Sequence, residues 1–241
     1  MKKLSSCILI LIFAISCSPD NDDANSLSHE TVLPLQRVYV DSPANPDNNY
    51  DRAGQLHNEI LEAYTGNGAG LPSTVSGIIT KVETTANANT GFLSIKGQAY
   101  QQASSTRVQY LLANQSTAVS GAINSSGLSS AGKASLSTFT SGFFSIYNQL
   151  ATYESLYNYI TVYESAVIAD QNLTTTDKRI ILTSTSVTRH SSYYSRKRPK
   201  KNTDPEWDLL IGNIAGAIEG SVAGSAEAIT LALATGIAEN Q

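Results

Sequence analysis

Residues 139–167, FTSGFFSIYNQLATYESLYNYITVYESAV, carry the most regular hydrophobic pattern in the chain. Large apolar and aromatic side chains recur there at alternating steps of four and three residues. This is the spacing of a heptad seam along one face of an α-helix. Glu164 and Val167 continue the same count, so we predict one long helix over residues 132–170. Its seam consists of Phe139, Phe143, Ile146, Leu150, Tyr153, Tyr157 and Ile160.

Helical spacing continues on both sides of this stretch. One helical face starts at Tyr50, another follows Pro72, and a third covers residues 97–123. Thr174 is placed to cap a further helix, because Asp177 stands three residues later in the capping-box position. No stretch alternates apolar and polar residues as a half-buried strand would. The sequence therefore predicts an all-α fold built as a helical bundle.

The length suits one or two domains with a buried core, and the composition excludes several other classes of protein. Of the 241 residues, 41% are hydrophobic and only 15% are charged, against about a quarter in typical domains, and the formal net charge is −4. A collagen-like chain, a disulfide scaffold and a chain that binds nucleic acid over its whole length are all excluded. We assign the core to a helical bundle over residues 50–195.

The first 16 residues have the pattern of an export signal. Two lysines are followed by an apolar run that is too short to span a bilayer. The run ends in Ala-Ile-Ser-Cys, which resembles the bacterial lipobox, so we predict a lipoprotein signal peptide over 1–16 and lipid attachment at Cys17. Acyl chains would hold the protein on a membrane without a spanning helix. An ordinary secretory peptide with an incidental cysteine is the alternative.

The segment after the cysteine is predicted to be a lipid-anchored, flexible tether over residues 17–49. It is rich in Pro, Asn and Asp, which disfavour regular structure. An acidic run at 20–23 resembles the export signal of surface lipoproteins in Bacteroidetes-type bacteria, and a plain solvated tether is the other interpretation. The expected location is the outer membrane, facing the cell surface.

The C-terminal part begins with a basic hinge over residues 196–206, followed by a Gly/Ala-rich helix over 207–241. A glycine inside a helix costs about 1 kcal/mol, and close approach of two helix backbones is the usual compensation. The spacing therefore predicts a glycine zipper. Its glycines are Gly212, Gly216, Gly220 and Gly224, and Ala228, Ala232 and Gly236 extend the row.

Three interpretations of this row stay open. The helix is packed on the bundle, or it is a zipper that forms a homo-oligomer or enters a bilayer, or it is a tail that folds on a partner protein through residues 209–238. Glu219 argues against insertion, because a charge within a membrane costs about 2.5–3.5 kcal/mol or more. The basic run alone is typical of a solvated loop, so we expect no nucleic-acid partner.

Candidate chemistry is sparse. No catalytic, metal-binding or phosphate-binding motif is present, and we expect no cofactor and no metal. His57 and His190 both fall at or near the inner face of their helices, which suggests a buried structural polar pair. An enzyme would instead show a concave pocket with converging polar groups around His57 or His190.

Tyrosines off the heptad seam are the other lead. The count places Tyr153 on the seam and Tyr159 off it. If Tyr159 and Tyr163 line a second contact or a ligand groove, Tyr153 should be buried and Tyr159 more exposed.

Taken together, the sequence resembles a group of Bacteroidetes-type surface lipoproteins that carries no activity to transfer. The likeness implies a helical cell-surface protein. We predict a non-enzymatic, lipid-anchored protein that presents a helical interaction surface. The alternative is a membrane-active or toxin-like protein whose zipper inserts into or oligomerises in a bilayer. The motifs are Tyr50-Asp51, Gly54-x-x-His57-Asn58, Leu173-Thr-Thr-Thr-Asp-Lys-Arg, Ser-Ser-Tyr-Tyr at 191–194 and the small-residue-rich C-terminus.

Overall fold

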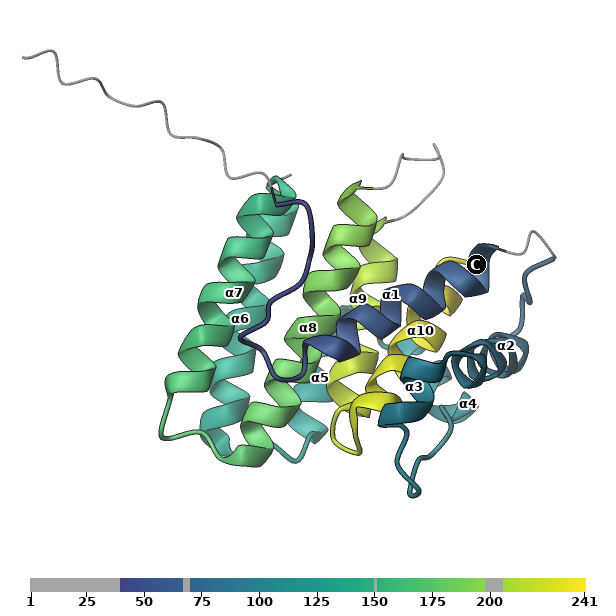
Figure 1. Cartoon of the computed structure of the whole chain (residues 1–241), viewed down its shortest axis with the longest axis horizontal. Helices are drawn as coiled ribbons and strands as arrows, with labels where there is room; N and C mark the ends of the chain where they lie inside the picture. Colours follow the sequence, from purple (N-terminus) through teal and green to yellow (C-terminus); the bar gives the residue numbers. More distant parts are fainter. Residues whose placement is uncertain (1–39, 67–69, 150, 198–205) are drawn as a thin grey trace, which may run out of the picture. The chain divides into compact units, whose positions relative to one another are not determined.

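The computed structural model describes residues 40–66, 70–149, 151–197 and 206–241. This part of the chain is all-α, without a strand, which confirms the predicted fold class. Its helices, shown in Figure 1, are α1 (Asp51–Gly66), α2 (Val75–Ala88), α3 (Thr90–Ile95), α4 (Ser105–Ala113), α5 (Gln115–Ser125), α6 (Ser130–Asn148), α7 (Tyr153–Ala169), α8 (Thr175–Lys197), α9 (Glu206–Gly220) and α10 (Ser225–Glu239).

The predicted cap of α8 is present and also serves a second helix. The Asp177 N–H donates to Thr174 Oγ1 at 3.0 Å, and the Thr174 N–H donates to Asp177 Oδ2 at 3.0 Å. The same carboxylate accepts hydrogen bonds from the Ser129 N–H and hydroxyl, each at 2.8 Å. Because Ser129 caps α6, one buried aspartate fixes the starts of α6 and α8 together.

The long helix predicted over 132–170 is wrong. The chain breaks after Asn148, and α7 starts at Tyr153 behind the cap Thr152, so α6 and α7 form an antiparallel hairpin (Figure 1). The seam is shared between the two helices. Phe139, Phe143, Tyr153 and Ile160 are buried, whereas Ile146 and Tyr157 are only partly buried. A heptad count that runs on in phase does not show where a chain turns back. Leu150 of the predicted seam lies outside the described residues.

The helix expected over 97–123 is also divided. It starts later, at Ser105, and Asn114 separates α4 from α5 with a non-helical backbone (φ −122°, ψ 31°). Leu111 of α4 and the buried residues of α5 belong to one apolar cluster, whereas Val108 of α4 packs with Ile79, Leu231 and Ala234 in another. Val108, Leu111, Val119, Ala122 and Ile123 are buried.

The single C-terminal helix predicted over 207–241 is wrong as well. α9 ends at Gly220, a short turn follows, and α10 runs back along α9 from Ser225. The Gly224 N–H donates to the Gly220 carbonyl at 3.1 Å and closes this turn. α10 is buried almost along its whole length against α9, α1 and α2. The C-terminal hairpin therefore forms the centre of the described part of the chain.

Two apolar clusters make up most of the core, and α8 and α9 contribute to both. Ile180 and Ile181 of α8 pack with α5, α6, α7 and α9 in the first cluster. Val187 of α8 and Ala217 of α9 pack with α1, α2 and α10 in the second. Figure 1 shows α8 between the α6/α7 hairpin and the C-terminal hairpin.

Residues 40–49 form an ordered segment without helix that we call the strap. In Figure 1 it passes along α7 and α8 to the start of α1. Asn45 and Asn48 are buried within it, so this end of the expected tether (17–49) is packed on the helices. Residues 1–39, with Cys17 and the predicted signal peptide, and residues 198–205 of the basic hinge lie outside the described residues. Within the described ranges, no helix is both long enough and apolar enough to cross a membrane.

Candidate functional site

The C-terminal half of α8 is polar and yet buried. Residues 183–186 and 188–192 are all buried, and most carry hydroxyl groups. Three of these hydroxyls are satisfied within the helix: Ser184, Thr188 and Ser192 each donate to the carbonyl one turn earlier, at 2.7–2.8 Å. Thr185 and Ser186 donate to Glu164 of α7 and to the Asp51 carbonyl of α1. These hydrogen bonds lower the cost of burying the polar groups of this helix. It also brings Arg189 and His190 into the interior.

Arg189 holds three parts of the chain together. Its side chain is fully buried and donates from Nε to the Pro43 carbonyl of the strap at 2.7 Å. Nη1 donates to Glu164 of α7 at 2.7 Å, and Nη2 pairs with Asp51 at the start of α1. One guanidinium therefore serves two carboxylates and a carbonyl from different elements.

Glu164 is the fully buried partner in this cluster. Its carboxylate also accepts from Asn45 at 2.6 Å, from Asn48 at 2.8 Å and from Thr185 at 2.8 Å. A buried carboxylate needs such compensation, because an unpaired one would be strongly destabilising. The heptad spacing by itself assigns Glu164 no role, although a charged residue on an apolar seam is a visible signal of an internal ion pair.

Asp51 connects the buried cluster to a titratable histidine. The His190 Nε2 lies 3.1 Å from Asp51 Oδ1. Burial alone would raise the pKa of Asp51, but hydrogen bonding by His190 and the charge of Arg189 outweigh it and lower the pKa. Burial lowers the pKa of His190 in spite of this carboxylate. The pair is therefore an ionised aspartate beside a neutral imidazole that donates from Nε2.

His57 belongs to the same region and is fully buried. Burial lowers its pKa to about 4. His57 Nδ1 lies 3.0 Å from Asn58 Oδ1, and Asn58 Nδ2 donates to the His190 carbonyl at 2.8 Å. The two histidines that we predicted as a polar pair are thus linked through Asn58.

Gly54 sets how closely α1 and α8 cross. A β-carbon at position 54 would lie 2.5 Å from His190 Cδ2, so any side chain there would displace the imidazole. The Gly54 N–H donates to Ser186 Oγ at 3.0 Å across the same crossing. The motif Gly54-x-x-His57-Asn58 is therefore one contact surface, which positions His190 beside Asp51.

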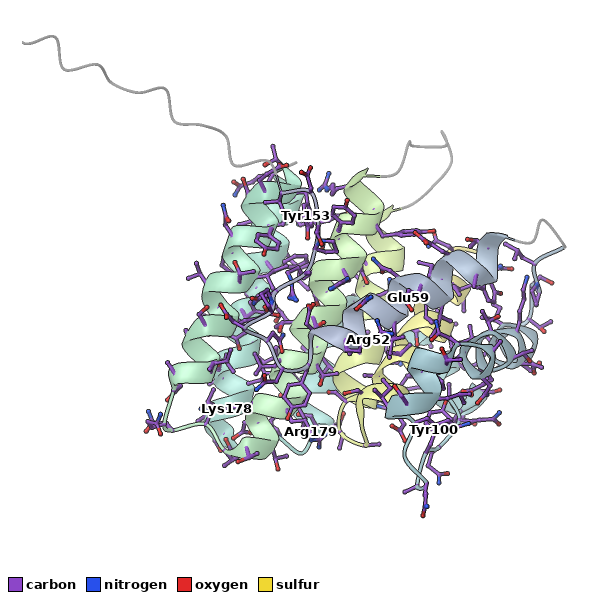
Figure 2. All side chains as sticks on the ribbon, in the orientation of Figure 1. Arg52, Glu59, Tyr100, Tyr153, Lys178 and Arg179 are labelled. Atoms are coloured by element: carbon purple, nitrogen blue, oxygen red, sulfur yellow. The ribbon has the colours of Figure 1, made fainter. Side chains whose placement is uncertain are left out.

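A cavity of about 460 Å³ lies beside this pair, between the strap, α1 and the end of α8. It is a concave pocket with polar groups around His190. Figure 2 shows Arg52 and Glu59 next to each other on α1, and Arg52 Nη1 lies 3.2 Å from Glu59 Oε1. The cavity is lined by Ser42, Pro43, Ala44, Asp51, Gln55, Asn58, Glu59, Glu62, His190, Tyr193 and Tyr194.

A second hollow, which we call the α6/α7 groove, has a volume of about 770 Å³. Its centre is an aromatic stack in which the Phe139 ring lies 5.5 Å from the Tyr159 ring and 4.4 Å from the Tyr163 ring. The hydroxyl of Tyr159 donates to the Phe139 carbonyl at 3.0 Å. The groove is lined by Ala134, Ser135, Thr138, Phe139, Asn158, Tyr159, Val162, Tyr163 and Ala166, none of which carries a formal charge.

The tyrosine prediction is confirmed. Tyr153 is 3% exposed, whereas Tyr159 is partly exposed and lines the groove. Phe139 also lines the groove, which its position on the heptad seam does not predict.

Three of the four predicted zipper glycines face α10. A β-carbon on Gly212, Gly216 or Gly220 would lie 2.9, 2.7 or 2.6 Å from the α-carbon of Gly236, Ala232 or Ala228 respectively. Gly224 lies in the turn between the two helices. The row of small residues therefore reverses direction at Gly224, and its two halves pack against each other in α9 and α10.

The negative charge of Glu219 on α9 is paired with Arg107 of α4.

In the described ranges, no group of three His, Cys, Asp or Glu side chains could hold a metal ion. No family model, no curated protein and no solved structure matches the chain.

Proposed function

We propose that this chain is a non-enzymatic, lipid-anchored protein of the bacterial outer membrane that presents the α6/α7 groove to a partner protein at the cell surface. The location is supported by the lipobox-like sequence at Cys17 and the acidic run behind it. The single observation that carries the interaction is the groove itself, an uncharged hollow with an aromatic floor.

The chemistry of the groove favours the apolar face of an amphipathic helix. A groove between two antiparallel helices accepts a third helix, whose apolar side chains fit an uncharged lining. Val162 lines the groove with 70% of its surface exposed, so it extends the apolar lining to the open side of the groove. An ionic ligand would find no charged group along this lining.

Two variants test the location. Cys17→Ala should abolish labelling with radioactive palmitate and release the protein from the membrane fraction. External protease should degrade the wild-type protein on intact cells. Unchanged labelling of the variant, or full protection of the wild type, would remove the proposed location.

Site-specific photo-cross-linking tests the groove. A benzophenone side chain at Val162 should cross-link one discrete helical segment of a partner on intact cells. Ile168 is the matched control, because it lies on the same helix, is 38% exposed and does not line the groove. Equal products from both positions, or none from position 162, would contradict the proposed interaction.

A further inference from the structure

We propose that the cavity beside Asp51 and His190 is a binding site for an organic cation that carries a primary ammonium group. This site is separate from the α6/α7 groove and does not depend on the function proposed for that groove. Its volume of about 460 Å³ falls within the range of small-molecule sites. The strap, α1 and α8 each contribute one wall.

The walls of the cavity are negatively charged. Asp51, Glu59 and Glu62 line it, and no lysine or arginine is among its described lining residues. Arg52, outside the lining, pairs with Glu59 and offsets that one charge. Asp51 shares the charge of Arg189 with Glu164, and Glu62 has no cationic partner among the described residues, so the potential at the cavity stays negative and attracts cations.

The His190 ring provides a second, independent feature. Its side chain is only 5% exposed, and it lines the cavity. Nε2 carries the proton that is donated to Asp51, so Nδ1 is an acceptor. Among the hydrogen bonds of the described residues, none reaches this Nδ1. A donor on a ligand in the cavity could therefore meet this acceptor.

The Asp51 carboxylate can also accept a hydrogen bond from a ligand in the cavity. The hydrogen bonds from Arg189 and His190 both reach Oδ1, and 19% of the side chain is exposed where it lines the cavity. Arg189 also serves Glu164, so one positive charge is shared by two carboxylates. With His190 neutral, the cluster holds one negative charge in excess, which a cation in the cavity would balance.

The acceptors at the cavity determine the class of ligand. A carboxylate oxygen and an imidazole nitrogen must both be met by donors, and an ammonium group provides three donors and a positive charge. Tyr193 and Tyr194 add aromatic surface, which favours cations over neutral polar groups. A single hydroxyl group brings one donor and no charge, so an alcohol would satisfy the site less well.

A fluorescent amine tests the proposal on the full chain, purified in a neutral detergent. Dansylcadaverine carries a primary ammonium, and its N-acetyl derivative keeps the fluorophore and the alkyl chain without the charge. We expect saturable binding of the amine, competition by cadaverine, and at least a tenfold weaker affinity for the acetylated probe. Equal affinity for both probes, or no saturable binding of the amine, would overturn the proposal.

Two variants tie the binding to this cavity. Glu62→Gln removes an exposed wall charge and should weaken amine binding by about threefold to tenfold, the effect of one charge near the ligand. Asp47→Asn is the matched control, because Asp47 is exposed and does not line the cavity. His190→Phe keeps a ring without nitrogen atoms and should reduce binding more than tenfold. Equal binding by Glu62→Gln and Asp47→Asn would overturn the site even where His190→Phe fails to fold.

Discussion

Gly216 of α9 lies so close to Ala232 of α10 that a β-carbon on Gly216 would come within 2.7 Å of the Ala232 α-carbon. The close backbone approach that helix glycines call for is thus supplied inside the chain, by the other half of the same small-residue row. A partner molecule is not needed to offset the cost of these glycines.

Replacing Gly216 tests this contact. Gly216→Ala should destabilise the protein by about 2–4 kcal/mol, because the new methyl group meets α10 backbone that cannot move without separating the two helices. Chemical denaturation of the full chain measures the change. Gly121→Ala in α5 is the control, since a β-carbon there meets open space, and it should stabilise by about 0.5–1 kcal/mol.

The sequence predicted the helical class, the cap of α8 and the difference in burial between Tyr153 and Tyr159, because each depends on residues close together in the chain. Tyr157, which the same count places on the seam, is only partly buried. The positions of the two reversals were not predictable from periodicity. The apolar count continues in phase through Thr152 into α7, and the small residues continue through Gly224 into α10. Both halves of a hairpin face the same core, so the pattern carries no sign of the turn.

The cluster around Arg189 depends on long-range contacts and was largely beyond the sequence. Asp51, Glu164 and Arg189 are far apart in the chain, and only the crossing of α1, α7 and α8 brings their charges together. His190 was found because a histidine on an inner helix face is conspicuous. The sequence predicts a flexible tether where the structure has the strap. Asn and Pro indicate an irregular backbone, but they do not show whether that backbone is solvated or packed on helices.

Removing the C-terminal hairpin tests its place in the fold. A chain that lacks residues 206–241 should lose its cooperative thermal transition and much of its helical circular dichroism, because α10 fills the core beside α1 and α2. The full chain should leave dye-filled anionic vesicles intact. A truncated chain that stays folded, together with leakage caused by the full chain, would instead favour the membrane-active function.

The buried ion cluster gives a prediction on coupling. Arg189→Met should cost about 3–5 kcal/mol, since it leaves the carboxylates of Glu164 and Asp51 without their counter-charge. Glu164→Gln in the Arg189→Met background should cost much less than it does alone. Unfolding free energies of the two single variants and the double variant measure this coupling, and simple additivity would mean that the pair does not act as a unit.

The last prediction concerns pH. His57 has a pKa of about 4 in the folded protein, against an ordinary value of 6.5. Between these values the unfolded chain binds the proton and the folded one does not, so stability falls as the pH is lowered through this window. Between pH 7 and pH 5 the contribution of His57 amounts to a loss of about 2 kcal/mol.

His57→Gln removes the titration and should flatten the stability profile by this amount. Glutamine cannot take up a proton, so the stability of the wild type relative to the variant should fall by about 2 kcal/mol between pH 7 and pH 5. The pKa of His190 is also lowered and gives both proteins a common slope of the same sign. The lowered pKa of Asp51 acts below its ordinary 3.8, where its contribution is lost as the carboxylate is protonated. Denaturation at a series of pH values measures the two profiles, and parallel curves would show that His57 is not held neutral by burial.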